Sequence, residues 1–285
     1  MQRVSDRVYV ETGHLGSNNS VLVADDGLVL FDAPHKPTDA IRWAQTVAAF
    51  GEPRYLVNSD HHPDHTIGNN WLGGVGVAHA GTRQRLAYDF PDQEYLDGLI
   101  ARIDPEAADL VAGFRVRLPS LVFTERLTLH MAGLTLELLH VPGHTANSVI
   151  AYFPEDRVIL TGDNVCEVGL PSFQDAALGD WFDALDVIEG YDFDVLVCGH
   201  GEPADRGVVA TYRKRGRELV AEVAAAIASG EPRERAADRI RFEDRIHVST
   251  PDYVGYPGWL LTSFQQRSVR SIYDALVADP GLADR

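Results

Sequence analysis

Cysteine, lysine and long apolar runs are scarce in this chain of 285 residues. The two cysteines, Cys166 and Cys198, exclude the multi-bridge disulfide framework of small secreted proteins. No stretch approaches the roughly 20 apolar residues that a membrane-spanning helix needs, so we expect no membrane partner. Residues 1–10 alternate polar and apolar side chains and lack the apolar centre of a signal peptide. These absences predict a cytoplasmic protein.

Basic residues are also in the minority. The chain has 25 Lys and Arg against 42 Asp and Glu, which gives a net charge of −17. Nucleic-acid binding depends on Lys and Arg that neutralise phosphates, so we expect no nucleic-acid partner. The hydrophobic and charged fractions, 45% and 24%, are typical of a globular protein with a well-buried core. We expect the partner to be a small-molecule substrate, and a homo-oligomer is compatible with the composition.

Short apolar runs separated by turn residues predict many β-strands. Residues 21–24 and 28–31 flank the turn Asp25-Asp26-Gly27 and predict a hairpin. Further strands are expected at residues 54–58, 75–80, 121–123, 127–130, 134–141, 149–153, 158–161 and 195–198. Helices are expected at residues 37–50, directly after Gly81-Thr82, at 88–118 with breaks at Pro91 and Pro105, and at 181–188, 212–229 and 264–277.

The order of these elements predicts two sheets with helices on their outer faces. From about residue 205 the pattern becomes almost entirely helical. We therefore expect a metal-binding catalytic domain over residues 1–205. A C-terminal helical extension over residues 206–285 is expected to pack on that same domain.

Four short segments concentrate histidine and aspartate next to turn residues. The first covers residues 58–69, and the others are residues 142–145, 161–164 and 198–201. Each segment follows a predicted strand, and loops at strand ends are where sheet proteins assemble their sites. Imidazole and carboxylate groups are common ligands of divalent metals. The joint occurrence of four such segments predicts a metal site.

In this order and spacing the segments resemble the motifs of the metallo-β-lactamase superfamily, whose first motif is His-x-His-x-Asp-His. The resemblance covers about residues 4–205. It implies an α/β fold, an αββα four-layer sandwich, and a two-metal hydrolase in which a hydroxide between the metals is the nucleophile. It also implies two divalent ions, with zinc the expected metal. Carried over, the first metal binds His62 and His144, the second binds Asp64, His65 and His200, and Asp163 binds both. Asp64 and Asp163 are the residues that we expect to be catalytic.

One position departs from the motif, because Asp60 stands where the family has its first histidine, and His61 comes one place late. Alternate residues of an extended segment point the same way, so we expect Asp60 and His62 to face the metal and His61 to face away. Asp60 is therefore assigned to the first metal. The additional carboxylate makes the metal core less positive, which favours manganese or iron at this position and a neutral substrate.

Other residues have weaker patterns. We expect Asp32 to accept a hydrogen bond from a histidine that binds the metal, without binding the metal itself. Cys166 either reaches the site or packs as a small apolar residue. An aromatic loop either lines a substrate pocket or packs the extension onto the body; its residues are Tyr253, Tyr256 and Trp259. We expect structural roles for His79 and His140, and no partner cluster accompanies His14, His35, His130 or His247.

Hydrolysis of an ester-like bond, such as a thioester or lactone, in a small and neutral substrate is the function that we expect. A polyketide cyclase or lyase on the same scaffold is the first alternative, in which the metals stabilise an enolate and no water attacks. A mononuclear iron oxygenase is the second, because it needs only the first-site ligands. A non-catalytic metal-binding protein is the third.

Overall fold

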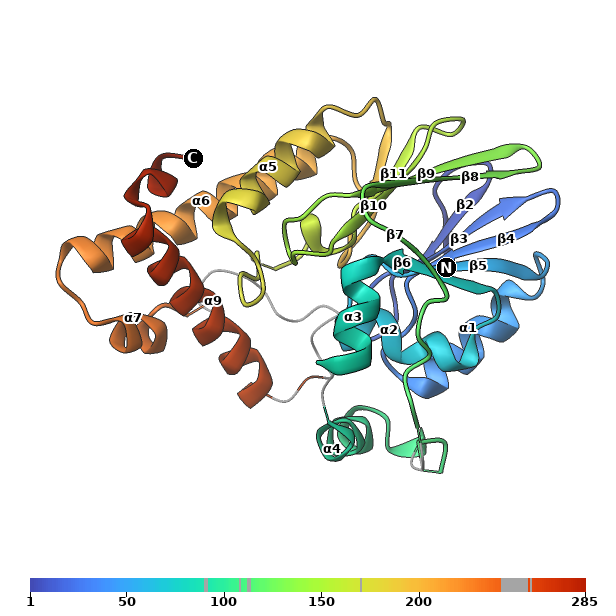
Figure 1. Ribbon diagram of the computed structural model, residues 1–285, viewed down its shortest axis with the longest axis horizontal. Coiled ribbons are helices and arrows are strands. Elements are labelled where there is room, and N and C mark those ends of the chain that lie inside the picture. The colour runs from blue at the N-terminus through green and yellow to red at the C-terminus, as the bar shows by residue number, and fades with distance from the viewer. Residues whose placement is uncertain (90–91, 108, 112–113, 170, 242–255, 257) are drawn as a thin grey trace.

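Two β-sheets pack face to face, and the C-terminal helices extend to one side of them (Figure 1). The computed structural model describes residues 1–285 apart from 90–91, 108, 112–113, 170, 242–255 and 257. The first sheet has the strand order β1-β2-β3-β4-β5-β6-β7, with strands β1 (Gln2–Arg3), β2 (Val8–Glu11), β3 (Asn19–Ala24), β4 (Gly27–Phe31), β5 (Pro53–Val57), β6 (Val75–His79) and β7 (Leu121–Phe123). The second has the order β12-β11-β10-β9-β8, with strands β8 (Arg126–Met131), β9 (Leu134–His140), β10 (Val149–Phe153), β11 (Val158–Leu160) and β12 (Val195–Val197).

Helices cover the outer faces of the sheets. The described α-helices are α1 (Pro37–Val47), α2 (Pro63–Thr66), α3 (Ala80–Tyr88), α4 (Gln93–Ile103), α5 (Leu178–Glu189), α6 (Gly207–Ala228), α7 (Arg233–Arg239) and α9 (Gly258–Ala278). Short 3-10 helices lie at Ile67–Trp71, Pro105–Ala107, Gly162–Asn164 and Pro280–Asp284. Within the described part of the chain, no helix has the length and apolar character needed to cross a membrane.

Alternation along the strands explains the layers. On β4, Val29 and Phe31 join a buried cluster that lies between the two sheets, whereas Leu28 and Leu30 pack on the other face against Trp43 of α1. Successive side chains of a strand point to opposite faces, so a strand that is apolar throughout is covered on both sides. The outer face of the second sheet packs in the same way against α5 and α6. The architecture is therefore the expected αββα sandwich.

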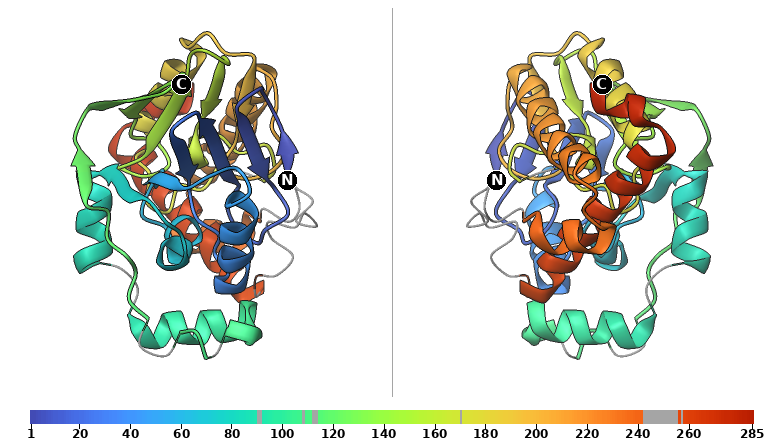
Figure 2. Two further views of the ribbon diagram at one scale, coloured as in Figure 1. Left: turned by 90° about the vertical axis from the view of Figure 1, so that its right-hand side faces the viewer. Right: turned by 90° about the vertical axis from the view of Figure 1, so that its left-hand side faces the viewer.

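The C-terminal helices α6, α7 and α9 pack against one another, and α6 and α9 also pack against α5 (Figure 2). The Tyr212 ring of α6 lies 5.6 Å from the Trp181 ring of α5, measured between centroids. Gly216 on α6 permits this close packing, because a Cβ there would lie 2.5 Å from a ring carbon of Trp181. The backbone amide of Phe173 also donates a hydrogen bond to the Ser268 hydroxyl of α9 at 3.0 Å.

The structure corrects two secondary-structure predictions. The expected helix over residues 88–118 is shorter: α4 ends at Ile103, and the described residues 109–111 and 114–119 form turns and irregular chain. The expected break at Pro105 is present, because α4 ends two residues before this proline, which supplies no backbone N–H to continue a helix; Pro91 lies outside the described residues. The helix after β6 begins at Ala80 and so includes Gly81 and Thr82, which were expected to precede it; the His79 ring accepts the Gly81 amide proton and caps the helix.

Candidate metal centre

The predicted ligands converge from loops that follow strands of both sheets. Asp60 follows β5, His144 lies between β9 and β10, and His200 follows β12. Asp163 lies in the 3-10 helix after β11. Asp64 and His65 belong to the short helix α2, which begins at Pro63, a favoured first helical residue because no N–H is needed there.

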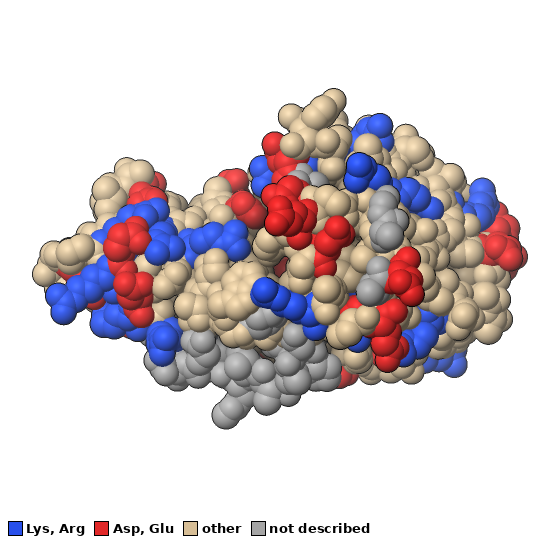
Figure 3. Space-filling view, turned by 90° about the horizontal axis from the view of Figure 1, so that it is seen from below, with Lys and Arg blue, Asp and Glu red and all other residues tan. Residues whose placement is uncertain are grey.

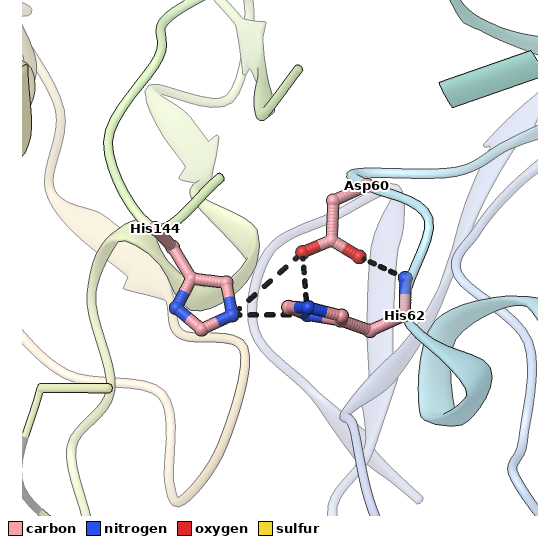
Figure 4. A group of neighbouring side chains, drawn as sticks. All are labelled: Asp60, His62 and His144. Carbon is pink, nitrogen blue, oxygen red and sulfur yellow. Dashed lines mark hydrogen bonds and ion pairs between the residues drawn. The ribbon is translucent and has the colours of Figure 1, made fainter. Parts of the chain in front are cut away.

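Two ligand sets consist of predicted ligands, and Asp60, His62 and His144 form the first (Figure 4). A further group, His61, His62 and Asp175, shares His62 with it. The donor atoms of the first set all lie within 4.8 Å of one another. His62 Nδ1 is 3.1 Å from His144 Nε2 and 3.3 Å from Asp60 Oδ2, so these three atoms face a common point. The other Asp60 oxygen accepts the backbone N–H of His62 at 2.8 Å, which fixes the carboxylate in this orientation.

Asp64, His65 and His200 form the second set, also within 4.8 Å. Asp163 lies between the two sets. Its Oδ1 is 3.4 Å from His65 Nε2, and its Oδ2 is 3.3 Å from His200 Nε2 and 3.5 Å from His144 Nε2. A single carboxylate therefore contacts ligand candidates of both sets.

The buried donor atoms fit divalent metal ions. Asp60 Oδ2, His65 Nε2 and Asp163 Oδ1 are buried and have no hydrogen-bond partner among the described residues. An unsatisfied buried polar atom is destabilising, so a cluster of such atoms indicates a group that binds them. Imidazole nitrogen and carboxylate oxygen are suitable donors for zinc, manganese and iron.

Negative charge holds protons on this cluster. Burial by itself lowers the pKa of His62, but the Asp60 charge and a hydrogen bond to Asp175 outweigh burial and raise the pKa to about 10. Burial opposes the charged form of His65 as well, yet Asp32, Asp60 and Asp163 raise its pKa well above the usual value. Burial lowers the pKa of His144. Protons on His62 and His65 therefore supply positive charge that the neighbouring carboxylates favour.

Asp32 holds His65 from behind, as expected. Its Oδ2 lies 2.9 Å from His65 Nδ1, and its two oxygens accept the Ser59 amide and hydroxyl, both at 2.7 Å. Fixing Nδ1 in this way directs Nε2 of His65 toward Asp163. Asp32 has a φ of 58°, an uncommon conformation for a residue other than glycine, which the three hydrogen bonds stabilise.

Two neighbours of His62 differ from the sequence-based prediction. His61 does not face away: its ring lines the same cavity, with its centroid 4.7 Å from that of His62. The period-two argument fails because β5 ends at Val57, so residues 60–62 are no longer in an extended strand. Asp175 lies 2.9 Å from His62 Nε2 but comes from a loop with no metal motif, so no sequence signal indicated it.

Asn164 and Gly199, which adjoin Asp163 and His200 in the sequence, help to shape the ligand loops. The Asn164 side chain accepts the His144 amide at 2.8 Å and donates to the Val141 carbonyl at 2.9 Å. Gly199 has no space for a side chain, because a Cβ there would collide with the Asp163 carboxylate. These contacts explain why the turns contain these residues.

A cavity of about 690 Å³ opens onto both ligand sets. Tyr256 and Trp259 line it, as does Cys166, while Tyr253 lies outside the described residues. His35 is an unexpected member, and its Nδ1 lies 2.6 Å from the Tyr256 hydroxyl. His79 and His140 do not line this cavity and instead stack on each other, with their ring centroids 3.9 Å apart. His247 lies outside the described residues.

Comparison with known proteins gives a family match and several distant relatives. Residues 13–200 match the family model described as the metallo-beta-lactamase superfamily. A metallo-beta-lactamase family protein from Thermus thermophilus has a similar structure, with a TM-score of 0.70, 18% identity, and coverage of 98% of this chain and 96% of that chain. A metallo-beta-lactamase from Pontibacter korlensis has a TM-score of 0.57 at 20% identity, over 73% of this chain and 94% of that one.

Among curated proteins, a linear primary-alkylsulfatase from Pseudomonas sp. (strain ATCC 19151) is 29% identical over 37% of this chain. A hydroxyacylglutathione hydrolase from Pelagibacter ubique is 22% identical over 52% of this chain. The matches span 19% of the first relative and 51% of the second. This chain therefore shares with each of them part of its length.

Proposed function

This chain belongs to the metallo-beta-lactamase superfamily, and from that premise we propose that it is a metal-dependent hydrolase of an ester-like bond, such as a thioester or lactone. The observation that carries the proposal is the position of Asp163 between two complete ligand sets. A mononuclear enzyme would need only one set. The presence of a second set of three donors supports a two-metal site and argues against a mononuclear oxygenase.

The ligand assignment follows the geometry. Asp60, His62 and His144 would hold the first metal, and Asp64, His65 and His200 the second, with Asp163 contacting both. When bound, two divalent cations, zinc or at the Asp60 position manganese or iron, lower the pKa of a bound water and polarise the scissile carbonyl.

The protein residues supply position and proton transfer. Asp163 fixes the spacing of the two sets, because each of its oxygens contacts a histidine. Asp64 keeps 20% of its side chain exposed and lines the cavity, so its carboxylate is placed to accept the proton of the attacking water. Asp32 and Asp175 orient the rings of His65 and His62.

Activity of the metal-loaded protein tests the proposal. Protein reconstituted separately with zinc, manganese and iron would be assayed on p-nitrophenyl esters, thioesters and lactones, with Asp163→Asn as the inactive comparison. We expect turnover that depends on metal and falls by at least about a thousandfold in Asp163→Asn. Incorporation of heavy oxygen from water into the product distinguishes hydrolysis from a cyclase or lyase reaction. Metal-loaded protein that turns over none of these substrates would reject the proposal.

A further inference from the structure

One part of the cavity wall is apolar and is built by two helices, α4 and α9. Its residues are Tyr95 and Leu99 of α4 and Trp259, Leu260 and Phe264 of α9. Leu99 and Leu260 are buried together with Leu15, which gives the wall a packed backing. In contrast, Tyr95 is 40% and Trp259 51% exposed. Exposed aromatic side chains that line a cavity favour contact with an apolar ligand group.

A cation lies at the same wall. Arg267 of α9 lines the cavity, with its guanidinium carbon 5.2 Å from the centroid of the Phe264 ring. Among the described residues, Arg267 has no ion pair, whereas Arg270, almost one turn further along α9, pairs with Glu234 at 2.8 Å. Acidic and basic side chains are intermixed on the face of the molecule that Figure 3 shows.

Three other acidic residues that line the cavity contact groups other than Arg267. Asp92 caps α4 by accepting the Tyr95 amide at 2.8 Å. Asp89 and Asp175 lie 3.8 and 3.9 Å from Arg85, the other arginine that lines the cavity. Of the two arginines that line the cavity, Arg267 is therefore the one without a carboxylate partner among the described residues, which leaves its guanidinium for an anion of the ligand. A guanidinium fork matches a carboxylate in shape and hydrogen-bond direction.

We propose that the cavity binds an ester whose apolar arm lies along the wall of α4 and α9 and ends in a carboxylate at Arg267. This inference rests on the proposed hydrolase function, since it places the scissile bond at the ligand sets. The proposed substrate has two distinct parts. Its reacting ester is neutral, as expected for a carboxylate-rich metal site, and its charged carboxylate lies at the other end of the apolar arm. The cavity volume of about 690 Å³ lies in the range of small-molecule sites.

Binding without turnover tests this inference separately from hydrolysis. Three hydroxamates, which bind metal through their head group, would be titrated by calorimetry into the zinc-loaded protein: acetohydroxamate, octanohydroxamate and suberic monohydroxamate, which carries a terminal carboxylate. We expect octanohydroxamate to bind at least about tenfold more tightly than acetohydroxamate, because its chain is buried on the wall. The terminal carboxylate is expected to add roughly fivefold.

Matched variants assign each gain to its residue. Arg267→Gln is expected to abolish the gain in affinity from the terminal carboxylate and to keep the gain from the alkyl chain. Arg270→Gln, on the same helix, is expected to keep both gains. Trp259→Ala is expected to reduce the gain from the chain several-fold. Tyr88→Ala is its control, because Tyr88 is 83% exposed and does not line the cavity.

The outcomes separate the two hypotheses. Equal affinity for octanohydroxamate and suberic monohydroxamate, or equal loss of the carboxylate gain in both arginine variants, overturns the inference even if esters are hydrolysed. If the affinity pattern appears but no ester is turned over, the binding site stands and the proposed hydrolase function is wrong.

Discussion

The Tyr256 hydroxyl lies 2.6 Å from Nδ1 of His35, a residue that is 3% exposed and follows the end of β4. This contact joins residues 221 positions apart in the sequence and ties the chain just before α9 to the body of the sandwich. Both residues line the cavity. The C-terminal part of the chain is thus a component of the cavity wall.

Removal of that hydroxyl tests whether the tie matters for substrate binding. Tyr256→Phe is expected to lower kcat/KM about fivefold, the value of one lost hydrogen bond, while the metal content stays the same. Tyr273→Phe is the matched control, because its hydroxyl donates to the Glu231 carbonyl at 2.9 Å within the C-terminal helices. Equal kinetic effects of the two substitutions would contradict a specific role of Tyr256.

Asp60 is predicted to set the acidity of the metal centre. Two divalent ions carry +4, and Asp60, Asp64, Asp163 and a hydroxide carry −4, so the core is neutral, whereas a histidine in place of Asp60 leaves it at +1. A more positive core lowers the pKa of bound water, so Asp60→His is expected to move the acid limb of the pH–kcat profile lower by about one pH unit. It also shifts first-site preference toward zinc. If the acid limb of the Asp60→His profile keeps its position or moves to higher pH while both metals are bound, Asp60 is not a ligand.

Asp175 is predicted to support the first metal through His62. A carboxylate on the far nitrogen of a ligating histidine orients the ring and raises its basicity, and its removal typically weakens metal affinity about 10- to 100-fold. Asp175→Asn is expected to have this effect at the first site and to leave the second unchanged, measured by competition with a chelator. Asp89→Asn is the control, since Asp89 lines the same cavity but contacts Arg85. Equal affinity in both variants would exclude the role.

Metal uptake is predicted to release protons. The pKa of His62 is raised to about 10 and that of His65 is also raised, so both rings are protonated at neutral pH in the metal-free protein. A metal binds only the deprotonated nitrogen, so loading should release about two protons per chain, and affinity should fall as the pH is lowered. A pH indicator in weakly buffered solution measures the release, with Asp89→Asn as the control. Uptake without proton release would contradict the pKa shifts.

Local sequence was sufficient to predict the candidate ligands and most of the sheets. The hairpin of β3 and β4 follows from two apolar runs around a glycine turn, and the structure places it as expected. His144 and His200 could be selected because each adjoins glycine directly after a predicted strand, and the structure brings them together with Asp163. Such features depend on neighbours in the chain, so they are visible in the sequence.

Contacts between distant segments were decided by the tertiary structure alone. Asp175 reaches His62 across 113 positions, and its loop carries no periodic or motif-like pattern. The His61 orientation depends on how the chain turns after β5, and the apolar wall exists because α4 and α9 face one cavity. In each case the physical cause is the packing of layers and helices, which places side chains near one another whatever their separation in the sequence.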